Sequence, residues 1–234
     1  MELILVRHGQ PAWSTPDGRG RNDPGLTELG HAQAAAVAAR LADPAHEPAP
    51  GPVDRLLVST AVRARETCAP IEAALDMDAE LHPWLHEINN PPAWEGAPLE
   101  HIDAAFRELR GRPRAEMWNG IAGMEPLHDF HERVLGGLHG FLREVGVLPD
   151  GEPGLWQVAD DAPTRVVAVA HGGTNSTIIA HLLGIRPEPW EWDRFVMGHA
   201  SVAILATSPL AGANLWSLRA LGDANHLALD DRTL

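Results

Sequence analysis

The sequence has few basic residues, a single cysteine and no long apolar run. Only 18 basic residues stand against 32 acidic ones, and the net charge of −14 disfavours nucleic-acid or acidic-membrane binding, which needs a basic surface. The lone Cys68 excludes an internal disulfide. The first apolar run, residues 3–6, ends at Arg7 and is too short for a signal peptide, and no stretch reaches the length of a membrane span. These absences predict a cytoplasmic protein that binds neither nucleic acid nor membrane.

The composition is that of a globular protein, with 44% apolar and 21% charged residues. A chain of 234 residues favours one α/β domain over two, so residues 1–234 are expected to form a single domain. Homodimers are common among enzymes of this size, and the sequence leaves a homodimer open.

Apolar runs and helical patterns alternate along the chain. The apolar runs predict strands at residues 3–6, 53–58, 165–170, 202–206 and 215–221. Helices are expected at residues 27–41, 61–75, 99–110, 127–145 and 174–183, the first capped by Thr27 and the last ended by Gly184. Loops are expected at residues 43–53, 82–98 and 149–163. The alternation predicts a three-layer α/β/α fold with a mostly parallel central sheet.

Two of the predicted strands end in a histidine followed by glycine. His8-Gly9 follows the first strand, and His171-Gly172-Gly173 follows the strand at 165–170. Ligands gather at the carboxyl ends of strands in open α/β sheets, so the two histidines are expected side by side. The glycines let backbone N–H groups come close to an anion, and the helix after Gly173 can point its N-terminus there.

A third strand end delivers Arg63 on the first turn of the following helix. Together with Arg7 and the two histidines it suits a phosphoryl group. Guanidinium groups hold the phosphate oxygens, and a neutral imidazole attacks phosphorus in line. Each feature alone would be weak, because a histidine after a strand is often structural and Arg63 could be a solvated helix residue. The coincidence of three junctions favours the phosphoryl-transfer interpretation.

Four segments in this order resemble the histidine phosphatase superfamily, also called the phosphoglycerate mutase-like family. They are Leu5–Gln10, Leu26–Ala34, Ser59–Thr67 and Val169–Gly173. The combined pattern is specific, whereas Arg-His-Gly alone would not be. The resemblance implies a helical and loop lid inserted at about residues 82–130 and no metal or cofactor. It also implies a small-molecule phosphate ester as the substrate.

Carried over position by position, the resemblance makes His8 the phosphorylated nucleophile, with Arg7, Arg63 and His171 around the phosphate. The family's proton donor is an acidic residue between the second arginine and the second histidine. It would protonate the leaving oxygen and then deprotonate the attacking water.

The family's proton donor often lies in Leu-x-Glu ahead of Trp-Glu-Gly. Residues 85–87 and 94–96 fit these patterns, so Glu87 is the expected donor and Glu95 the fallback. A solvated loop carboxylate is the plain alternative for Glu87.

The sequence departs from the family pattern near the nucleophile. Pro11 and Ser14 stand where many members have threonine and asparagine, so Gln10, Ser14 or Asn22 is expected to bind the phosphate, together with the backbone of Gly172. His199 stands where many members have asparagine, and contact with the pocket and a purely structural role are equally open.

The stretch at residues 18–25 lacks the longer motif typical of the family's mutases, which favours a phosphatase that hydrolyses a small phosphomonoester through a phosphohistidine on His8. A mutase-type phosphotransferase stays open, and so does a non-catalytic phosphate-binding domain. A metallohydrolase is a further alternative, because His82/His86 and His128/His131 have helical ligand spacing.

The aromatic residues at 82–130 favour a small satellite core, and an aromatic lid that selects an apolar leaving group is a weaker alternative.

Overall fold

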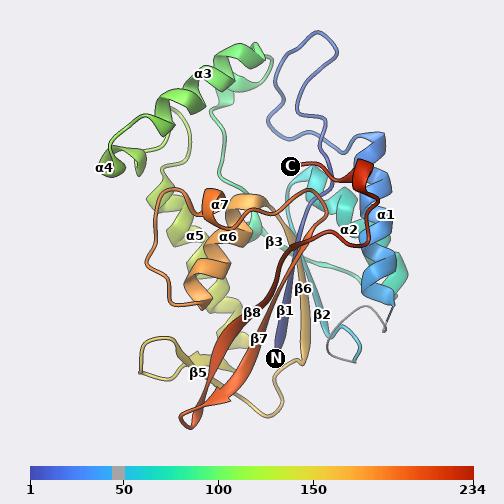
Figure 1. The fold of residues 1–234 in the computed structure, drawn as a ribbon, viewed down its shortest axis with the longest axis vertical. Helices are drawn as coiled ribbons and strands as arrows, with labels where there is room; N and C mark the ends of the chain where they lie inside the picture. Colours follow the sequence, from blue (N-terminus) through green and yellow to red (C-terminus); the bar gives the residue numbers. More distant parts are fainter. Residues whose placement is uncertain (44–50) are drawn as a thin grey trace.

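A central sheet carries the fold in the computed structural model, which describes residues 1–43 and 51–234. In this part of the chain the sheet has eight strands in the order β3-β2-β6-β1-β7-β8-β5-β4 (Figure 1). The strands are β1 (Glu2–Arg7), β2 (Arg55–Ser59), β3 (Glu80–His82), β4 (Val147–Pro149), β5 (Leu155–Val158), β6 (Arg165–Ala170), β7 (Val202–Leu210) and β8 (Ala213–Asp223). The predicted α/β class is confirmed, and β6 has the predicted bounds.

The sheet is mixed, which corrects the expectation of a mostly parallel one. Strands β3, β2, β6 and β1 run parallel, whereas β7 lies antiparallel to β1 and the pairings from there to β4 are all antiparallel. The two-residue turn Ala211–Gly212, with φ values of 52° and 80°, joins β7 to β8. Such a turn joins only antiparallel strands, so it accounts for the antiparallel pairing of β7 with β8.

Residues 149–163 do not form the loop that the sequence predicts over this whole stretch. They contain β5, which pairs with β4 and with β8 at the far edge of the sheet. Trp156 of β5 is only 5% exposed and belongs to the main core. Burial of this large side chain and pairing with the distant β8 stabilise a strand that is too short for its own periodicity to reveal.

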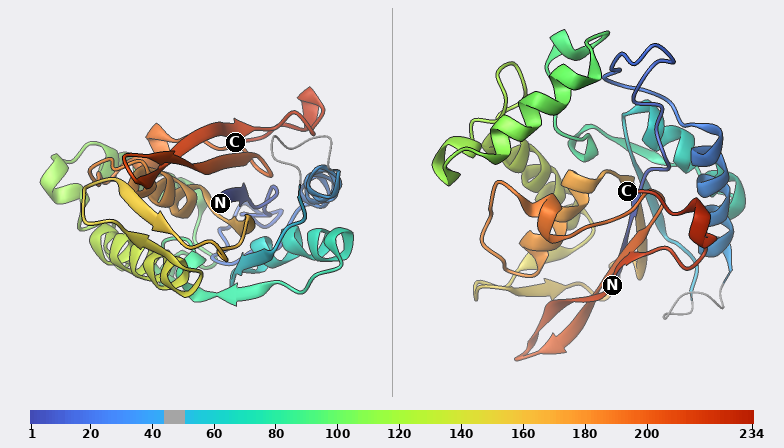
Figure 2. Two further views of the ribbon diagram at one scale, coloured as in Figure 1. Left: turned by 90° about the horizontal axis from the view of Figure 1, so that it is seen from below. Right: turned by 45° about the horizontal axis from the view of Figure 1, so that its top comes forward.

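Helices cover both faces of the sheet, as Figures 1 and 2 show. Helices α1 (Glu28–Ala42) and α2 (Val62–Leu75) lie on one face, and α5 (Leu127–Glu144) and α6 (Gly172–Leu182) on the other. A hydrophobic core lies on each face of the sheet, and alternate residues of β1 belong to the two cores. Leu3 and Leu5 face α5 and α6, whereas Ile4 and Val6 face α1 and α2. This alternation explains the continuous apolar run of β1, because both of its faces are buried.

The predicted helix signals correspond to real helix ends. The Thr27 side chain accepts a hydrogen bond from the Gly30 N–H, which caps α1 as expected. Gly184 follows α6 with a φ of 68°, in the left-handed region that glycine favours. The loop expected at residues 43–53 lies mostly outside the described residues, at positions 44–50.

The chain between β3 and α5 forms a lid above the carboxyl ends of β1, β2 and β6 (Figure 1). Helix α3 (Leu99–Arg110) has the predicted bounds, and short turns and α4 (Arg114–Met117) complete the lid. Its own small core consists of Trp94, Leu109, Met117, Ile121 and Met124. The expected satellite core therefore exists, but Trp94 is its only buried aromatic residue, because Trp84 packs against the main core and Phe106 is exposed. The remaining helix, α7 (Glu191–Arg194), follows α6 and faces the lid. Within the described residues, no helix combines the length and apolarity that a membrane span requires.

Candidate active site

His8 lies immediately after β1, and the sheet fixes its backbone. Its N–H donates to the Ala170 carbonyl on β6 at 3.0 Å. The next residue must be glycine, because a Cβ on Gly9 would lie 2.5 Å from the Gly30 carbonyl oxygen at the start of α1. The turn that presents His8 therefore depends on close backbone contact with α1.

The His8 imidazole is buried and held in one tautomer. Nδ1 lies 2.7 Å from the Gly9 carbonyl, which can only accept, so Nδ1 carries the proton. Nε2 accepts a hydrogen bond from Nε of Arg63 at 3.3 Å. Burial first, and then the charges of Arg63 and Arg7, lower the pKa of His8 well below its usual value. The ring is therefore neutral at physiological pH, and Nε2 has the lone pair that a nucleophile needs.

Arg63 comes from the first turn of α2, as the sequence predicts, and is only 2% exposed. Its Nη1 lies 3.3 Å from a carboxylate oxygen of Asp23, and its guanidinium lies 4.7 Å from the centre of the Trp13 ring. These contacts orient the guanidinium while its Nε points at His8. Asp23 and Trp13 were not predicted from the sequence, since nothing local shows that the loop after β1 folds back over α2.

Arg7 completes the positive end of the site. Its Nη1 donates to the Met197 carbonyl, and its Nη2 lies 3.1 Å from Nε2 of His199. Its buried Nε has no hydrogen-bond partner among the described residues, and the Gly172 backbone lies beside it. Burial lowers the pKa of both Arg7 and Arg63, and the Glu87 carboxylate opposes that shift. Both guanidinium groups stay charged, so a free N–H of Arg7 is available to an anion.

His171 lies against the nucleophile, with the two ring centres 5.1 Å apart. Its Nε2 is 2.8 Å from Oγ of Ser59, the last residue of β2. Burial first, then Arg63 and His8, lowers the pKa of His171 well below its usual value. The position of His171 is as predicted, whereas the contact with Ser59 was not predicted, although Ser59 lies at a third strand end.

Glu87 reaches the site from the lid. One carboxylate oxygen accepts the Gly173 N–H at 2.9 Å, and the other accepts the Ile88 N–H at 3.1 Å. The carboxylate thus lies at the N-terminus of α6 and lines the same cavity as His8. Glu95 lies elsewhere: it accepts the Asn22 N–H and does not line the cavity.

The predicted phosphate-binding residues separate into two groups. Gly172 and Asn22 line the cavity, although the Asn22 amide also donates to the Pro91 carbonyl of the lid. Gln10 and Ser14 do not line it. The Gln10 side chain instead accepts from the Thr27 hydroxyl at the cap of α1, and Ser14 is exposed on a loop that bridges to Gly20. The structure therefore does not bring these two side chains to the phosphate end.

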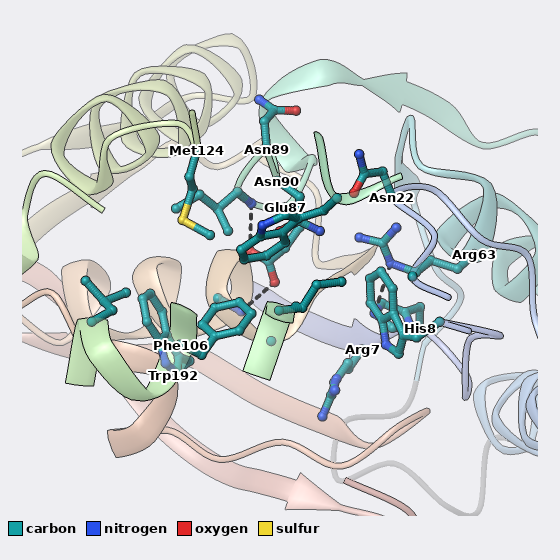
Figure 3. Close-up of a pocket in the computed structure, with 18 of the residues that line it drawn as sticks. Arg7, His8, Asn22, Arg63, Glu87, Asn89, Asn90, Phe106, Met124 and Trp192 are labelled. Atoms are coloured by element: carbon teal, nitrogen blue, oxygen red, sulfur yellow. Dashed lines mark hydrogen bonds between the residues drawn. The ribbon is translucent and has the colours of Figure 1, made fainter. Parts of the chain in front are cut away.

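One cavity of about 960 Å³ joins the catalytic residues to the lid (Figure 3). Arg7, His8 and Arg63 lie at one end, and Phe106, Met124 and Trp192 lie at the other. The wall comes from β1, α2, α6, the lid and α7.

The histidine pairs that were considered as metal ligands do not form a site. His82 ends β3 and accepts from the Trp84 indole, whereas Nδ1 of His86 faces the Glu87 carbonyl, so this pair is not on one helix. His128 and His131 are both on α5, but His128 is exposed and His131 is buried against Trp118. Over residues 1–43 and 51–234, no group of three or more His, Cys, Asp or Glu side chains is arranged to hold a metal ion.

A family model described as "Histidine phosphatase superfamily (branch 1)" matches residues 3–216. The chain belongs to the histidine phosphatase superfamily. A relative named "Probable phosphoglycerate mutase GpmB", from Cronobacter sakazakii, is 27% identical over 240 residues, which cover 99% of this chain and 98% of the relative.

Solved structures of two phosphatases have a similar fold. Mycobacterial glucosyl-3-phosphoglycerate phosphatase with inorganic phosphate is 25% identical, with a TM-score of 0.69 over 97% of this chain and 99% of that one. Phosphoserine phosphatase from Entamoeba histolytica, with 3-phosphoglyceric acid, is 22% identical, with a TM-score of 0.63 over 97% and 99% of the two chains. Both named phosphatases and named mutases are thus similar to this chain over nearly its full length.

Proposed function

We propose that this histidine phosphatase superfamily member is a metal-independent phosphomonoesterase with His8 as its nucleophile. The observation that carries the proposal is the state of His8. Its imidazole is neutral, its tautomer leaves the lone pair on Nε2, and that atom lies beside the buried Arg63. Fixed cations around a neutral nucleophile are the arrangement that phosphoryl transfer requires.

In the first step a bond forms between His8 Nε2 and phosphorus while the bond from phosphorus to the leaving oxygen breaks. Arg7 and Arg63 hold the phosphoryl oxygens, and protonated Glu87 gives its proton to the leaving oxygen, so an alcohol departs. In the second step a water oxygen bonds to phosphorus as the phosphorus–nitrogen bond breaks. Glu87 takes the proton of that water, and inorganic phosphate leaves with His8 neutral again.

The test measures phosphate release from p-nitrophenyl phosphate and several alkyl phosphates, with excess chelator present. The wild type is compared with His8→Ala and with His128→Ala, which removes an exposed histidine. We expect His8→Ala to lose about 1000-fold or more in kcat/KM, and His128→Ala to match the wild type. Brief incubation with labelled ester should give an acid-labile phosphoenzyme that His8→Ala lacks. Equal turnover by the wild type and His8→Ala would refute the assignment.

A mutase is the second candidate, because a named mutase is similar to the chain over 99% of its length. The same chemistry serves a mutase if the phosphohistidine transfers its phosphoryl group to a second substrate hydroxyl rather than to water. Incubation of 3-phosphoglycerate with a bisphosphoglycerate primer separates the two functions. Accumulation of 2-phosphoglycerate without release of phosphate would favour the mutase, and release of phosphate favours the phosphatase.

A further inference from the structure

The part of the cavity far from His8 is mostly apolar and aromatic, although the amides of Asn89 and Asn90 also line the cavity. Its wall includes Trp94, Ile102, Phe106, Met124, Trp192 and Phe195. In Figure 3 the labelled members of this set lie across the cavity from His8 and Arg63. A phosphate ester held at His8 would therefore direct its leaving group toward these side chains.

Two contacts connect the parts of this wall. Phe106 packs edge-on against Trp94 of the lid core, with ring centres 5.2 Å apart, and still keeps 38% of its surface exposed. Arg110 of α3 and Asp193 of α7 form an ion pair at 3.0 Å, which links the helices that carry Phe106 and Trp192. An exposed aromatic side chain on the wall of a cavity is typical of a surface that receives an apolar group.

The charges at this end do not suit a second anionic group. Apart from Arg7 and Arg63, the cationic side chains that line the described cavity are Arg21 and Arg110. Both arginines are exposed to water, which screens their charges, and Arg110 is also paired with Asp193. The carboxylate of Asp103 lines the cavity as well. A leaving group with its own carboxylate or phosphate would lose hydration here without a buried cation to replace it.

The size of the cavity agrees with a bulky leaving group. Its volume of about 960 Å³ is at the upper end of the roughly 300–1,000 Å³ usual for small-molecule sites. A phosphoryl group with a short polar alcohol would leave most of the aromatic wall in contact with water.

We infer that the substrate is the phosphate monoester of an apolar alcohol, whose ring or alkyl chain packs against Phe106 and Trp192. This inference rests on the proposed phosphatase function and narrows the broader expectation of a small phosphomonoester. The selectivity arises from the far wall, because the phosphoryl group is held in the same way in every ester.

The test is a series of straight-chain alkyl phosphates from ethyl to octyl, whose leaving alcohols have nearly equal acidity. We expect kcat/KM to rise by about three- to fourfold for each methylene that is buried, until the cavity is full. 3-Phosphoglycerate and phosphoserine should be poor substrates. A flat alkyl series, or a preference for 3-phosphoglycerate over octyl phosphate, would overturn the inference while the phosphatase function stands. Failure to hydrolyse any ester, p-nitrophenyl phosphate included, would refute both.

Two variants test whether the aromatic wall causes the preference for long alkyl esters. Phe106→Ala should lower the ratio of kcat/KM for octyl phosphate to that for ethyl phosphate by about tenfold. Leu148→Ala, at an exposed apolar residue of β4 outside the cavity, should keep the wild-type ratio. Equal losses on both esters in Phe106→Ala would assign Phe106 to the support of the lid and contradict the proposed contact. Thermal unfolding of both variants confirms that the fold is retained.

Discussion

Nε2 of His199 lies 3.1 Å from Nη2 of Arg7, and Nδ1 of His199 lies 2.8 Å from Oγ1 of Thr233. A guanidinium can only donate, so Nε2 must be the acceptor and Nδ1 carries the proton. Burial, and then the charge of Arg7, lowers the pKa of His199 to about 3, so the ring is neutral. His199 does not line the cavity. These contacts hold one side of the Arg7 guanidinium, so we expect His199 to position Arg7 rather than to touch the substrate.

His199→Ala should raise KM for phosphate esters by about tenfold and lower kcat less, because an oriented Arg7 binds the phosphoryl group in the ground state as well. His199→Gln, whose amide oxygen can accept from Arg7, should recover part of the loss. Steady-state kinetics on p-nitrophenyl phosphate measure both. An unchanged KM in His199→Ala would show that Met197 alone orients Arg7.

Glu87→Gln removes the proposed proton donor but keeps an acceptor for the Gly173 N–H. We expect a loss of about 100-fold or more in kcat on alkyl phosphates, whose leaving oxygen needs a proton. The loss on p-nitrophenyl phosphate should be much smaller, since nitrophenolate leaves unprotonated.

Glu95→Gln is the matched control for the proton donor, because Glu95 was the fallback donor and lies outside the cavity. It should leave both rates near those of the wild type. Equal losses on alkyl and aryl esters in Glu87→Gln would exclude proton donation by Glu87.

The parts of the site that the sequence predicted come from local signals. His8, Arg63 and His171 each follow a buried strand. The carboxyl ends of parallel strands meet at one edge of a sheet, and β1, β2 and β6 are parallel. The start of α1 could be predicted in the same way, because the cap formed by Thr27 involves only residues that are close in sequence.

The rest depends on contacts between distant segments. Gln10 looked like a phosphate ligand, but its side chain reaches Thr27 instead, and only the packing of α1 against the loop decides this. The strand β5 exists because β8 pairs with it, and the apolar wall joins Phe106 of α3 to Trp192 of α7. Short local windows do not contain such pairings.

The folded protein should lose stability in mild acid, and His131 is one cause. Burial lowers its pKa to about 4, and neither ring nitrogen has a hydrogen-bond partner among the described residues. In the unfolded chain this histidine has a pKa of about 6.5 and is protonated below that pH. In the folded protein His131 becomes protonated only near pH 4, so between these two pH values protonation favours the unfolded chain. Protonation of His131 therefore does not lower the free energy of unfolding well above pH 6.5, and it lowers that free energy by about 2 kcal/mol at pH 5.

Urea unfolding of His131→Leu at pH 7.5 and pH 5 tests this. The variant should lose about 2 kcal/mol less than the wild type between the two pH values, because leucine binds no proton. His128→Leu, at the exposed histidine one turn away, should keep the wild-type difference. An identical acid loss in His131→Leu and the wild type would show that other groups set the acid sensitivity.

Gly30 links the stability of the fold to the position of His8. A Cβ on Gly30 would lie 2.2 Å from the Gln10 carbonyl oxygen, which is backbone and cannot rotate away. Gly30→Ala must therefore push the loop after His8 off α1, at a cost of about 1–3 kcal/mol, and should lower kcat as His8 shifts.

Gly136→Ala is the matched control. Its Cβ would meet nothing within 4 Å on the exposed side of α5, so it should stabilise the protein by about 0.5–1 kcal/mol with kcat unchanged. Urea unfolding and kcat measured on the same preparations separate the two effects, and a Gly30→Ala protein with wild-type stability would contradict the close backbone contact.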